Sequence, residues 1–394
     1  MLCNPFRGRS TRFWIPIIIA VQLIFNLTVL VIYSRNSTVI IEKNVQKDLA
    51  TPSRSRQHSK PTEAMQKASP TKKASPTTKA SPTTKASPTK KAEIDMVNDY
   101  QPWVDFKFVY PEVQPALEGS KDLYLVVLVN SGAKGGLFTQ RRAKIRETWA
   151  SKKTCEYFIA ANQTHVRDKK WILVFVLGKV GNEEDDKRNI EEAKKHNDML
   201  IGDIDDNYLN NILKFYMGQL WASLHGAKYT LKTDDDVYVR IPKIIEYLVS
   251  QGSPPRFYGG ETYPNTAVAR WAGGKWSISK KYFDEPVFPP FNAGAFILMS
   301  TDLLDSLFHY VHIRKPFHTD DAYVGVAMRH FKVKVIHILS FDIKNHMAAL
   351  IRSKNNCEIL KLIAYGHDVK IYAMDHLHKR VEDLCHKKIT VKNC

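Results

Sequence analysis

Residues 227–239, which read AKYTLKTDDDVYV, decide the fold of this chain. The part from residue 228 to residue 233 predicts a strand, and it runs directly into Asp234, Asp235 and Asp236. In α/β sheets, ligands gather beyond the carboxyl ends of the strands. Because the triplet falls at such an end, it is the first candidate for a functional site.

Strand and helix patterns alternate on both sides of this stretch. Nearly continuous apolar runs at residues 123–129 and 171–177 are typical of strands covered on both faces. The clearest helix covers residues 208–225, because its apolar residues recur at i, i+3, i+4 and i+7. The remaining expected elements are polar helices at residues 139–150 and 183–197 and a strand at residues 333–338. This alternation predicts an α/β sheet.

Three consecutive carboxylates repel one another and are costly in a compact protein unless a cation compensates them. Side chains alternate along an extended segment, so Asp234 and Asp236 are expected to face one way and Asp235 the other. A hard divalent ion binds carboxylate and diphosphate oxygens together. The alternative is a solvated turn with a helix-capping aspartate, but the preceding strand and Lys232 favour a metal site.

The N-terminal part predicts a membrane anchor. Residues 13–33 contain no charged side chain and are long enough to cross a hydrocarbon core of ~30 Å. The run is longer than the apolar region of a cleaved signal peptide. Arginines are more frequent before it than just after it, so the positive-inside rule predicts a single-pass type II protein with a cytosolic tail at residues 1–12.

Residues 34–100 are predicted to be a disordered stem, followed by a lumenal catalytic domain at residues 101–394. Between residues 67 and 90 the hexapeptide Lys-Ala-Ser-Pro-Thr-(Lys/Thr) occurs four times. Such a segment has too few apolar residues to offset its backbone entropy. An O-glycosylated stalk and an unmodified spacer both remain open. Asn162-Gln163-Thr164 is an N-glycosylation sequon in the lumenal part.

The net charge of +18 does not indicate a nucleic-acid-binding protein. Residues 43–92 hold 12 Lys/Arg against 2 Asp/Glu, so much of the excess lies in the stem, and no nucleic-acid-binding motif accompanies it. The five cysteines show no metal-binding spacing. Cys3 is expected in the cytosol, and the other four permit two disulfides in three connectivities; these are Cys155, Cys357, Cys385 and Cys394.

Five ordered motifs give the chain a family resemblance. It resembles the β-1,3-glycosyltransferases of the galactosyltransferase and N-acetylglucosaminyltransferase type, relatives of Fringe in glycosyltransferase family 31, over roughly residues 123–385. Each motif is weak alone, and their joint order and spacing are specific. The motifs are RRAKIRETW (141–149), YLNNILK (208–214), AKYTLKTDDDVYV (227–239), KWSIS (275–279) and DDAYVG (320–325).

The resemblance implies a GT-A-like fold, with a mixed nucleotide-sugar-binding sheet flanked by helices. It also implies Mn²⁺-dependent, inverting transfer of a hexose from a UDP-sugar to a glycan on glycoprotein or glycolipid, with galactose in β-1,3 linkage as the first choice. The implied location is the Golgi membrane, with the catalytic domain in the lumen.

Competing hypotheses concern the donor and the activity itself. The donor could instead carry N-acetylglucosamine or N-acetylgalactosamine. Two hypotheses involve no catalysis: a lumenal glycan-binding relative that retains the fold, and a protein that binds anionic glycans through its basic stem. The presence of both carboxylate clusters in the chain favours the enzyme.

The same resemblance assigns the metal site and the nucleotide contacts. The last aspartate of the triplet, Asp236, is implied as the principal Mn²⁺ ligand. His367, in the sequence IAYGH, is the position that completes the metal site, and a surface-loop histidine is its alternative. Asp234 is placed near the nucleotide ribose or in the metal shell. Asp235 and Lys275 of the KWSIS motif are placed near the nucleotide.

The second acidic pair is expected to supply the base. Inversion in one displacement requires a carboxylate that accepts the proton of the attacking hydroxyl. By the family motif, Asp321 is the implied base and Asp320 supports it. The alternative is that the pair caps a helix beginning near Ala322, and both roles are compatible.

Two arginines on the first polar helix are candidate phosphate ligands. Arg142 and Arg146 lie four residues apart and therefore on one face, and arginine binds phosphate bidentately. The alternative is an ion pair with Glu147 or with the acidic helix at residues 183–197.

The segment FNAGA at residues 291–295 departs from the family. Gly294 is expected to permit close approach of the backbone to the donor sugar. Asn292 stands where many relatives carry Cys, and Ala322 replaces Val in the base motif; the first departure bears on the disulfide pattern and donor identity. Trp149 and Trp276 are expected in the core, and stacking of their rings on a sugar is the alternative.

Overall fold

The buried apolar runs form the centre of a seven-stranded mixed sheet. The computed structural model describes residues 104–117, 122–343 and 355–388. The strand order is β10-β6-β9-β4-β1-β2-β3, and β9 runs antiparallel to both of its main neighbours while the other strand pairs are parallel. The strands are β1 (Leu125–Asn130), β2 (Trp171–Lys179), β3 (Met199–Asp205), β4 (Tyr229–Asp234), β6 (Tyr258–Tyr263), β9 (Phe291–Ser300) and β10 (Val335–His337).

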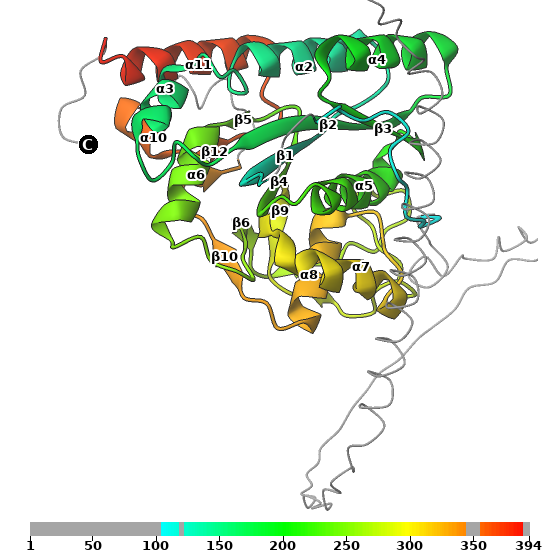
Figure 1. The fold of residues 1–394 in the computed structure, drawn as a ribbon. Coiled ribbons are helices and arrows are strands. Elements are labelled where there is room, and N and C mark those ends of the chain that lie inside the picture. The colour runs from blue at the N-terminus through cyan, green and yellow to red at the C-terminus, as the bar shows by residue number, and fades with distance from the viewer. Residues whose placement is uncertain (1–103, 118–121, 344–354, 389–394) are drawn as a thin grey trace, which may run out of the picture. The chain divides into compact units, whose positions relative to one another are not determined.

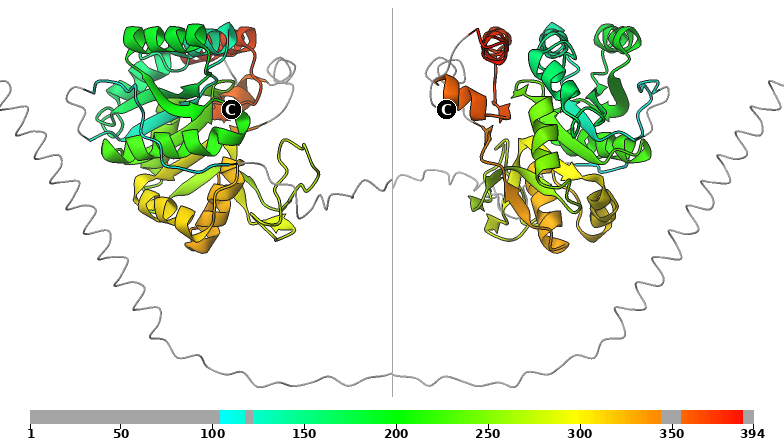
Figure 2. Two further views of the ribbon diagram at one scale, coloured as in Figure 1. Left: turned by 90° about the vertical axis from the view of Figure 1, so that its right-hand side faces the viewer. Right: turned by 60° about the vertical axis from the view of Figure 1, so that its left-hand side comes forward.

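Helices cover both faces of this sheet (Figure 1). One face packs against α2 (Gly136–Glu147), α3 (Cys155–Asn162), α4 (Glu183–His196), α6 (Ile241–Ser250) and α11 (Ile371–Cys385). The other face packs against α5 (Asn211–Leu224), α7 (Leu304–Ile313) and α8 (Asp320–His330). Figure 2 shows α11, α2 and α4 end-on and side by side in its right-hand view. The chain thus forms three layers.

The alternation of side chains along β1 explains the layers. All six residues of β1 are buried. Leu125, Val127 and Val129 belong to the apolar cluster on one face, and Val126 and Leu128 belong to the cluster on the other. A strand buried on both faces needs no polar positions, which is why β1 is a continuous apolar run.

The predicted elements are confirmed with small shifts at their ends. The strands expected at residues 123–129, 171–177, 228–233 and 333–338 are β1, β2, β4 and β10. The helices expected at residues 139–150 and 183–197 are α2 and α4, and residues 208–225 form the 3-10 helix η2 (Tyr208–Asn210) followed by α5. A second 3-10 turn, η3 (Thr301–Leu303), leads into α7.

Two small sheets accompany the central one, and the three-stranded one and a disulfide tie the C-terminal part to the rest. β5 (Tyr238–Val239), β12 (Ala364–Tyr365) and β11 (Phe341–Asp342) form one of them, and β7 (Thr266–Ala267) pairs with β8 (Val287–Phe288) in the other. A short helix, α10 (Asn356–Lys361), precedes β12. Cys155 at the start of α3 is disulfide-bonded to Cys385 at the end of α11, with their Cα atoms 6.1 Å apart.

All described residues belong to one compact unit, which spans residues 87–394. The predicted cytosolic tail (1–12), membrane span (13–33) and stem (34–100) lie outside the described residues. Among the helices that the structure describes, none has the length and apolar character needed to cross a bilayer.

Candidate active site

The acidic triplet lies at the carboxyl edge of the central sheet. β4 ends at Asp234, which pairs in register with Asn130 at the end of β1. The side chains of Asp234, Asp235 and Asp236 are 32%, 5% and 16% exposed. The middle carboxylate is therefore turned inward and the outer two are more accessible, in agreement with the predicted alternation.

Asp235 binds protein groups. Its Oδ2 accepts a hydrogen bond from Ser131 Oγ at 2.7 Å, and its Oδ1 accepts one from Arg141 Nη1 at 2.7 Å. Both oxygens are therefore occupied by donors from neighbouring segments. Because its side chain is also only 5% exposed, this carboxylate fixes the position of the triplet, and the contact of Asp235 with the nucleotide stays a prediction.

Asp236 retains an oxygen that no protein donor satisfies. Its Oδ1 is buried and has no hydrogen-bond partner among the described residues, while Arg141 Nη1 lies 3.8 Å from its Oδ2. Burial, reinforced by the negative charges of Asp234 and Asp235, raises the pKa of Asp236 to about 6. An orphaned buried carboxylate oxygen between like charges fits a divalent cation, which prefers hard oxygen ligands.

His367 lies on the loop that packs beside the triplet. This loop follows β12, and the backbone N–H of Val369 donates to the carbonyl oxygen of Asp236 at 2.8 Å. The His367 side chain is exposed. Within the described part of the chain, no group of three or more His, Cys, Asp or Glu side chains is arranged to hold a metal ion. The pairing of His367 with Asp236 as metal ligands stays a prediction.

The second acidic pair begins α8. Asp321 Oδ2 accepts a hydrogen bond from the backbone N–H of Gly294 at 3.0 Å, and its Oδ1 accepts one from Ala322 N at 2.8 Å. The second bond is to the N–H of the next residue, within the first turn of the helix. The N-cap of α8 is Thr319, and no side chain caps this end, so Asp321 does not take the capping role considered as an alternative. Both of its oxygens are held in place, as a positioned base requires.

Lys232 joins the two acidic clusters. Its Nζ lies 3.0 Å from Asp234 Oδ1 and 3.3 Å from Asp320 Oδ2, and it donates to the carbonyl oxygen of Gly294 at 2.6 Å. The side chain is 3% exposed. Lys232 was not among the site residues expected from the sequence, although a lysine inside a buried strand next to aspartates is a signal for such a role.

The charges in this cluster change the ionisation of its members. Burial alone would lower the pKa of Lys232, but the carboxylates of Asp234 and Asp320 outweigh it and raise this pKa. Burial and the charge of Asp320 raise the pKa of Asp321 to about 6, although Lys232 opposes the increase. Asp321 is therefore a stronger base than an ordinary carboxylate, and it is still mostly ionised at neutral pH.

Gly294 forms the floor between these groups. Its backbone N–H binds Asp321 and its carbonyl binds Lys232. A Cβ atom at this position would lie 3.3 Å from Asp321 Oδ2 and 3.5 Å from Lys232 Nζ. Gly294 therefore brings the backbone of β9 close to the catalytic candidates; its contact with the donor sugar stays a prediction.

Arg142 and Arg146 bind the acidic helix α4. Arg142 is fully buried and pairs with Glu192 at 2.6 Å, and its remaining N–H groups donate to other protein oxygens. Arg146 pairs with Glu192 and Asp198, both at 2.7 Å. The expectation that these arginines hold the diphosphate is corrected in favour of its alternative, because their donors are already used inside the protein.

Arg141, one residue earlier, is the arginine that reaches the acidic triplet. It contacts Asp235 and Asp236 at 2.7 and 3.8 Å, and its side chain is 13% exposed. The sequence patterns did not identify this residue, because the helical spacing that paired Arg142 with Arg146 says nothing about which helix face meets β4.

Lys275 lies on the acid-pair side of the site. Its Nζ is 4.5 Å from the centroid of the Tyr208 ring. Burial and the charges of Asp321 and Asp320 raise the pKa of Tyr208, so this ring is close to the acid pair. The contact of Lys275 with the nucleotide stays a prediction.

The two tryptophans expected in the core differ in burial. Trp149 is buried as expected, but Trp276 is 57% exposed. The expectation of a core position was wrong for Trp276, because the connection between β7 and β8 projects from the sheet (Figure 2).

Comparison with known families gives one match that covers half of the chain. The model of the family described as galactosyltransferase matches residues 140–339. The matched part contains the acidic triplet, Lys232, Gly294 and the acid pair, whereas His367 lies beyond it.

Curated relatives are similar over the same region. β-1,3-Galactosyltransferase 5 of Pan paniscus is 26% identical over 214 residues, which cover 54% of this chain and 66% of that protein. β-1,3-Galactosyltransferase 1 of Mus musculus is 27% identical over 210 residues, which cover 52% of this chain and 60% of that protein. A solved 4-diphosphocytidyl-2C-methyl-D-erythritol synthase from Anaerococcus prevotii is 9% identical with a TM-score of 0.30, covering 55% of this chain and 87% of its own. A score this low supports no conclusion.

Proposed function

The chain belongs to the galactosyltransferase family, and we propose that it transfers a hexose from a UDP-sugar to a hydroxyl group of a glycan on glycoprotein or glycolipid. The proposed product is a glycan that carries galactose in β-1,3 linkage, in keeping with the names of the relatives that match over the central part of the chain. The observation that carries the proposal is the position of Lys232, which brings Asp234 and Asp320 within 3.3 Å of one ammonium group.

The acid pair supports single-step inversion. In the proposed step, the acceptor oxygen attacks the anomeric carbon and the bond from that carbon to the UDP oxygen breaks. The proton of the hydroxyl passes to Asp321, and UDP leaves with the bonding electrons. Asp321 suits this role because its pKa of about 6 leaves it ionised at neutral pH and because Gly294 and Ala322 fix its two oxygens. Asp320 contributes the negative charge that strengthens the base.

The triplet supports a divalent cation at the other side of Lys232. Asp236 would hold Mn²⁺ with its unpartnered Oδ1, and His367 would complete the protein ligands. When bound, the ion supplies positive charge for the departing diphosphate. Asp234, Lys275 and the backbone of Gly294 are proposed to line the donor site. Asp234 suits this role because it is the most exposed of the three aspartates.

The wider organisation is part of the same proposal. The mixed sheet with helices on both faces, and the triplet at its carboxyl edge, support a GT-A-like fold. We place the catalytic unit in the Golgi lumen behind a type II membrane anchor and a stem. The disulfide between Cys155 and Cys385 supports an oxidising compartment.

The test is UDP release by the purified chain. UDP-galactose, UDP-N-acetylglucosamine and UDP-N-acetylgalactosamine are compared with a panel of glycan acceptors, with Mn²⁺ and with EDTA. Release is expected with UDP-galactose only when Mn²⁺ and an acceptor are present. Asp321→Asn is expected to lower kcat by at least ~10²-fold, since this is the lower range for a general base.

The matched control is Asp203→Asn. The Asp203 side chain is 69% exposed, and it lies on the edge strand β3, which β1 and β2 separate from β4. This exchange removes the same charge and should leave kcat unchanged. Activity that persists at full strength in Asp321→Asn or Asp236→Ala rejects the proposed chemistry.

A further inference from the structure

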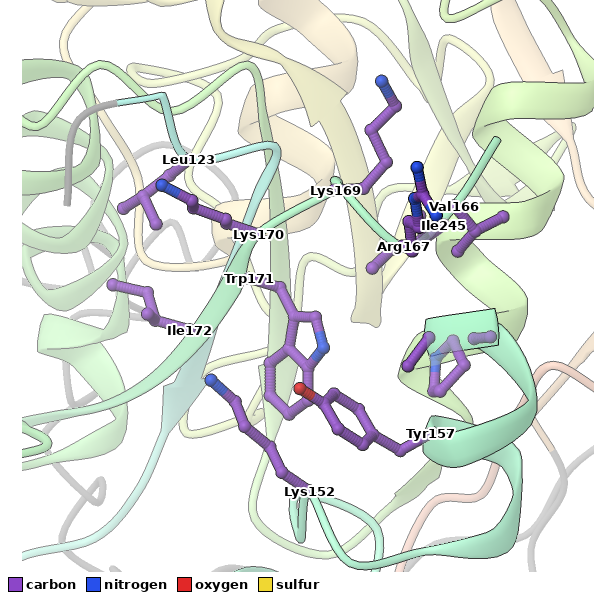
Figure 3. Close-up of a pocket in the computed structure, with 13 residues that line it drawn as sticks. Leu123, Lys152, Tyr157, Val166, Arg167, Lys169, Lys170, Trp171, Ile172 and Ile245 are labelled. Atoms are coloured by element: carbon purple, nitrogen blue, oxygen red, sulfur yellow. The ribbon is translucent and has the colours of Figure 1, made fainter. Parts of the chain in front are cut away.

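A cavity lies at the amino ends of the central strands, away from the acidic triplet (Figure 3). It has a volume of about 320 Å³ and is bounded by α3, α6, the start of β2 and the loop at residues 163–170. Trp171 begins β2 and pairs in register with Leu125, which in turn pairs with Tyr229. Tyr229 is five residues before Asp234 along β4, which corresponds to roughly 17 Å at the usual rise of a strand. The cavity is therefore separate from the acidic site.

The lining of this cavity combines aromatic rings with positive charges. Tyr157 and Trp171 meet with ring centroids 6.3 Å apart at 76°, and Lys152 Nζ lies 5.1 Å from the centre of the Trp171 ring. Figure 3 shows Lys152 and Tyr157 on either side of Trp171. The cationic residues that line the cavity are Lys152, Arg167, Lys169 and Lys170, and no carboxylate is among the residues that line it.

These charges are poorly neutralised by the described part of the protein. Arg167 has a contact with Asp168 at 3.8 Å, but the two side chains are 56% and 78% exposed, so the pair contributes little. Lys169 contacts the Tyr124 ring at 5.4 Å, a contact that leaves its charge in place. Four like charges around one hollow create a field that favours an anion.

We propose that this cavity binds an acidic sugar residue of a glycan, that is, a pyranose ring with a carboxylate or a sulfate group. Lysine and arginine donors suit either anion, and the aromatic rings offer apolar surface to the ring of the sugar. The volume lies at the lower end of the range of small-ligand sites, which matches a single sugar unit. The choice of a sugar rather than another anion rests on the proposed function. The position of the anion rests only on the residues that line the cavity.

The consequence is a glycan contact outside the catalytic centre. A glycan held at this cavity is about 17 Å along the sheet from the acid triplet, so it binds without entering the transfer site. Asn162 of the sequon is exposed and ends α3 beside the cavity. Because a glycan attached there would compete for the space, the test uses the Asn162→Gln background.

The experiment measures binding of defined sugars to the purified full-length chain by calorimetry. The probes are 3′-sialyllactose, which carries a carboxylate, 6-sulfated lactose, neutral lactose and inorganic sulfate. At least one acidic sugar is expected to bind ~10-fold tighter than lactose and than inorganic sulfate. Whether the carboxylated or the sulfated sugar binds identifies the anion that the cavity prefers. Raising the salt concentration should weaken this binding. Equal affinity for lactose, or for inorganic sulfate, overturns the proposal.

Matched variants locate the binding. Lys152→Ala/Lys169→Ala is expected to weaken the acidic sugar at least ~10-fold, in line with the loss of one charge-assisted hydrogen bond. Lys194→Ala/Lys195→Ala removes the same charge from exposed positions on α4 and should change the affinity less than ~2-fold. If both double variants weaken binding equally, the interaction is a general charge effect and the proposal is wrong.

Two further variants make the result independent of folding and of catalysis. Lys152→Glu is a single exchange at an exposed position, and it replaces the double variant if that protein fails to fold. It should abolish binding of the acidic sugar. Asp321→Asn should still bind the acidic sugar. If the unmodified chain binds the acidic sugar but shows no transfer activity, the proposed function is contradicted and the anion site is retained. If it shows transfer activity but does not bind the acidic sugar, the anion site is contradicted and the proposed function is retained.

Discussion

Replacement of Lys232 by methionine removes the positive charge on which both acidic clusters converge. Lys232 Nζ lies 3.0 Å from Asp234 and 3.3 Å from Asp320, in a side chain that is 3% exposed. An opposite charge within a few ångströms typically holds a carboxyl pKa down by ~1–3 units. Lys232 also lowers the pKa of Asp321, which is about 6 in the intact site, so this pKa should rise in Lys232→Met.

The sign of the pH effect follows from the role of Asp321 as a base. A base is active when deprotonated, so kcat/KM should rise with pH through the pKa of Asp321. With a pKa near 6, about 90% of the carboxylate is ionised at pH 7, and with a pKa of 7 or more this fraction falls to about half or less. The acid limb of the pH profile should move to higher pH, and part of the lost activity should return above pH 8. Asp320 and Tyr208 also face Asp321, and neither is changed in this variant.

The same exchange should destabilise the fold. Removing one partner of a buried ion pair costs about 3–5 kcal/mol, because the remaining charges stay buried. A second variant, Lys232→Met/Asp320→Asn, removes one of these charges and should recover part of the free energy of unfolding, measured by urea denaturation. The pair of variants separates loss of folding from loss of the base.

The assay is UDP release across pH 5–9, with Lys228→Met as the control. Lys228 is exposed and precedes β4, and its Nζ lies 5.8 Å from the centre of the Tyr229 ring at the amino end of that strand. The control should keep the acid limb near pH 6. A folded Lys232→Met protein with the same acid limb and the same kcat/KM would refute the catalytic role of this charge cluster.

Three further outcomes are expected. Arg142→Met should lower the free energy of unfolding by about 3–5 kcal/mol, since it leaves Glu192 with less compensation in a buried pair; a raised KM for the UDP-sugar at unchanged stability would instead restore the phosphate-binding role. Cys155→Ser/Cys385→Ser should cost about 2–5 kcal/mol in thermal or chemical unfolding, because the bond closes a loop of sequence separation 230; an unchanged Tm would argue against the bond. His367→Ala should raise the Mn²⁺ concentration for half-maximal activity by at least ~10-fold, given that loss of even an outer-shell partner costs 10–100-fold, and an unchanged Mn²⁺ titration would remove His367 from the metal site.

The exposed and buried tryptophans illustrate what a local pattern can and cannot predict. Trp149 and Trp276 both have a side chain that favours the core, yet Trp149 is 3% exposed and Trp276 is 57% exposed. Trp149 follows α2, which packs on the sheet, whereas Trp276 lies on a connection that leaves it. Hydrophobicity predicts that a side chain gains by burial, but the path of the chain decides whether a neighbour is available to bury it.

The sequence by itself determined the alternation of strands and helices and the position of the acid triplet at the end of β4. These features depend on short-range patterns: continuous apolar runs for strands buried on both faces, apolar residues at helical spacing for α5, and side-chain alternation for the inward turn of Asp235. The ordered motifs of the family added the candidate roles of Asp236 and Asp321.

Only the tertiary structure decided which charges meet. Lys232 reaches Asp320 because β9 runs antiparallel beside β4 and α8 packs on β9, which joins segments that are far apart in the sequence. Arg142 and Arg146 form ion pairs with α4, and Arg141 forms an ion pair with the triplet. The rotation of α2 on the sheet sets which face of this helix contacts α4 and which contacts the end of β4. Charge partners are chosen by long-range packing, and local sequence patterns carry no record of that choice.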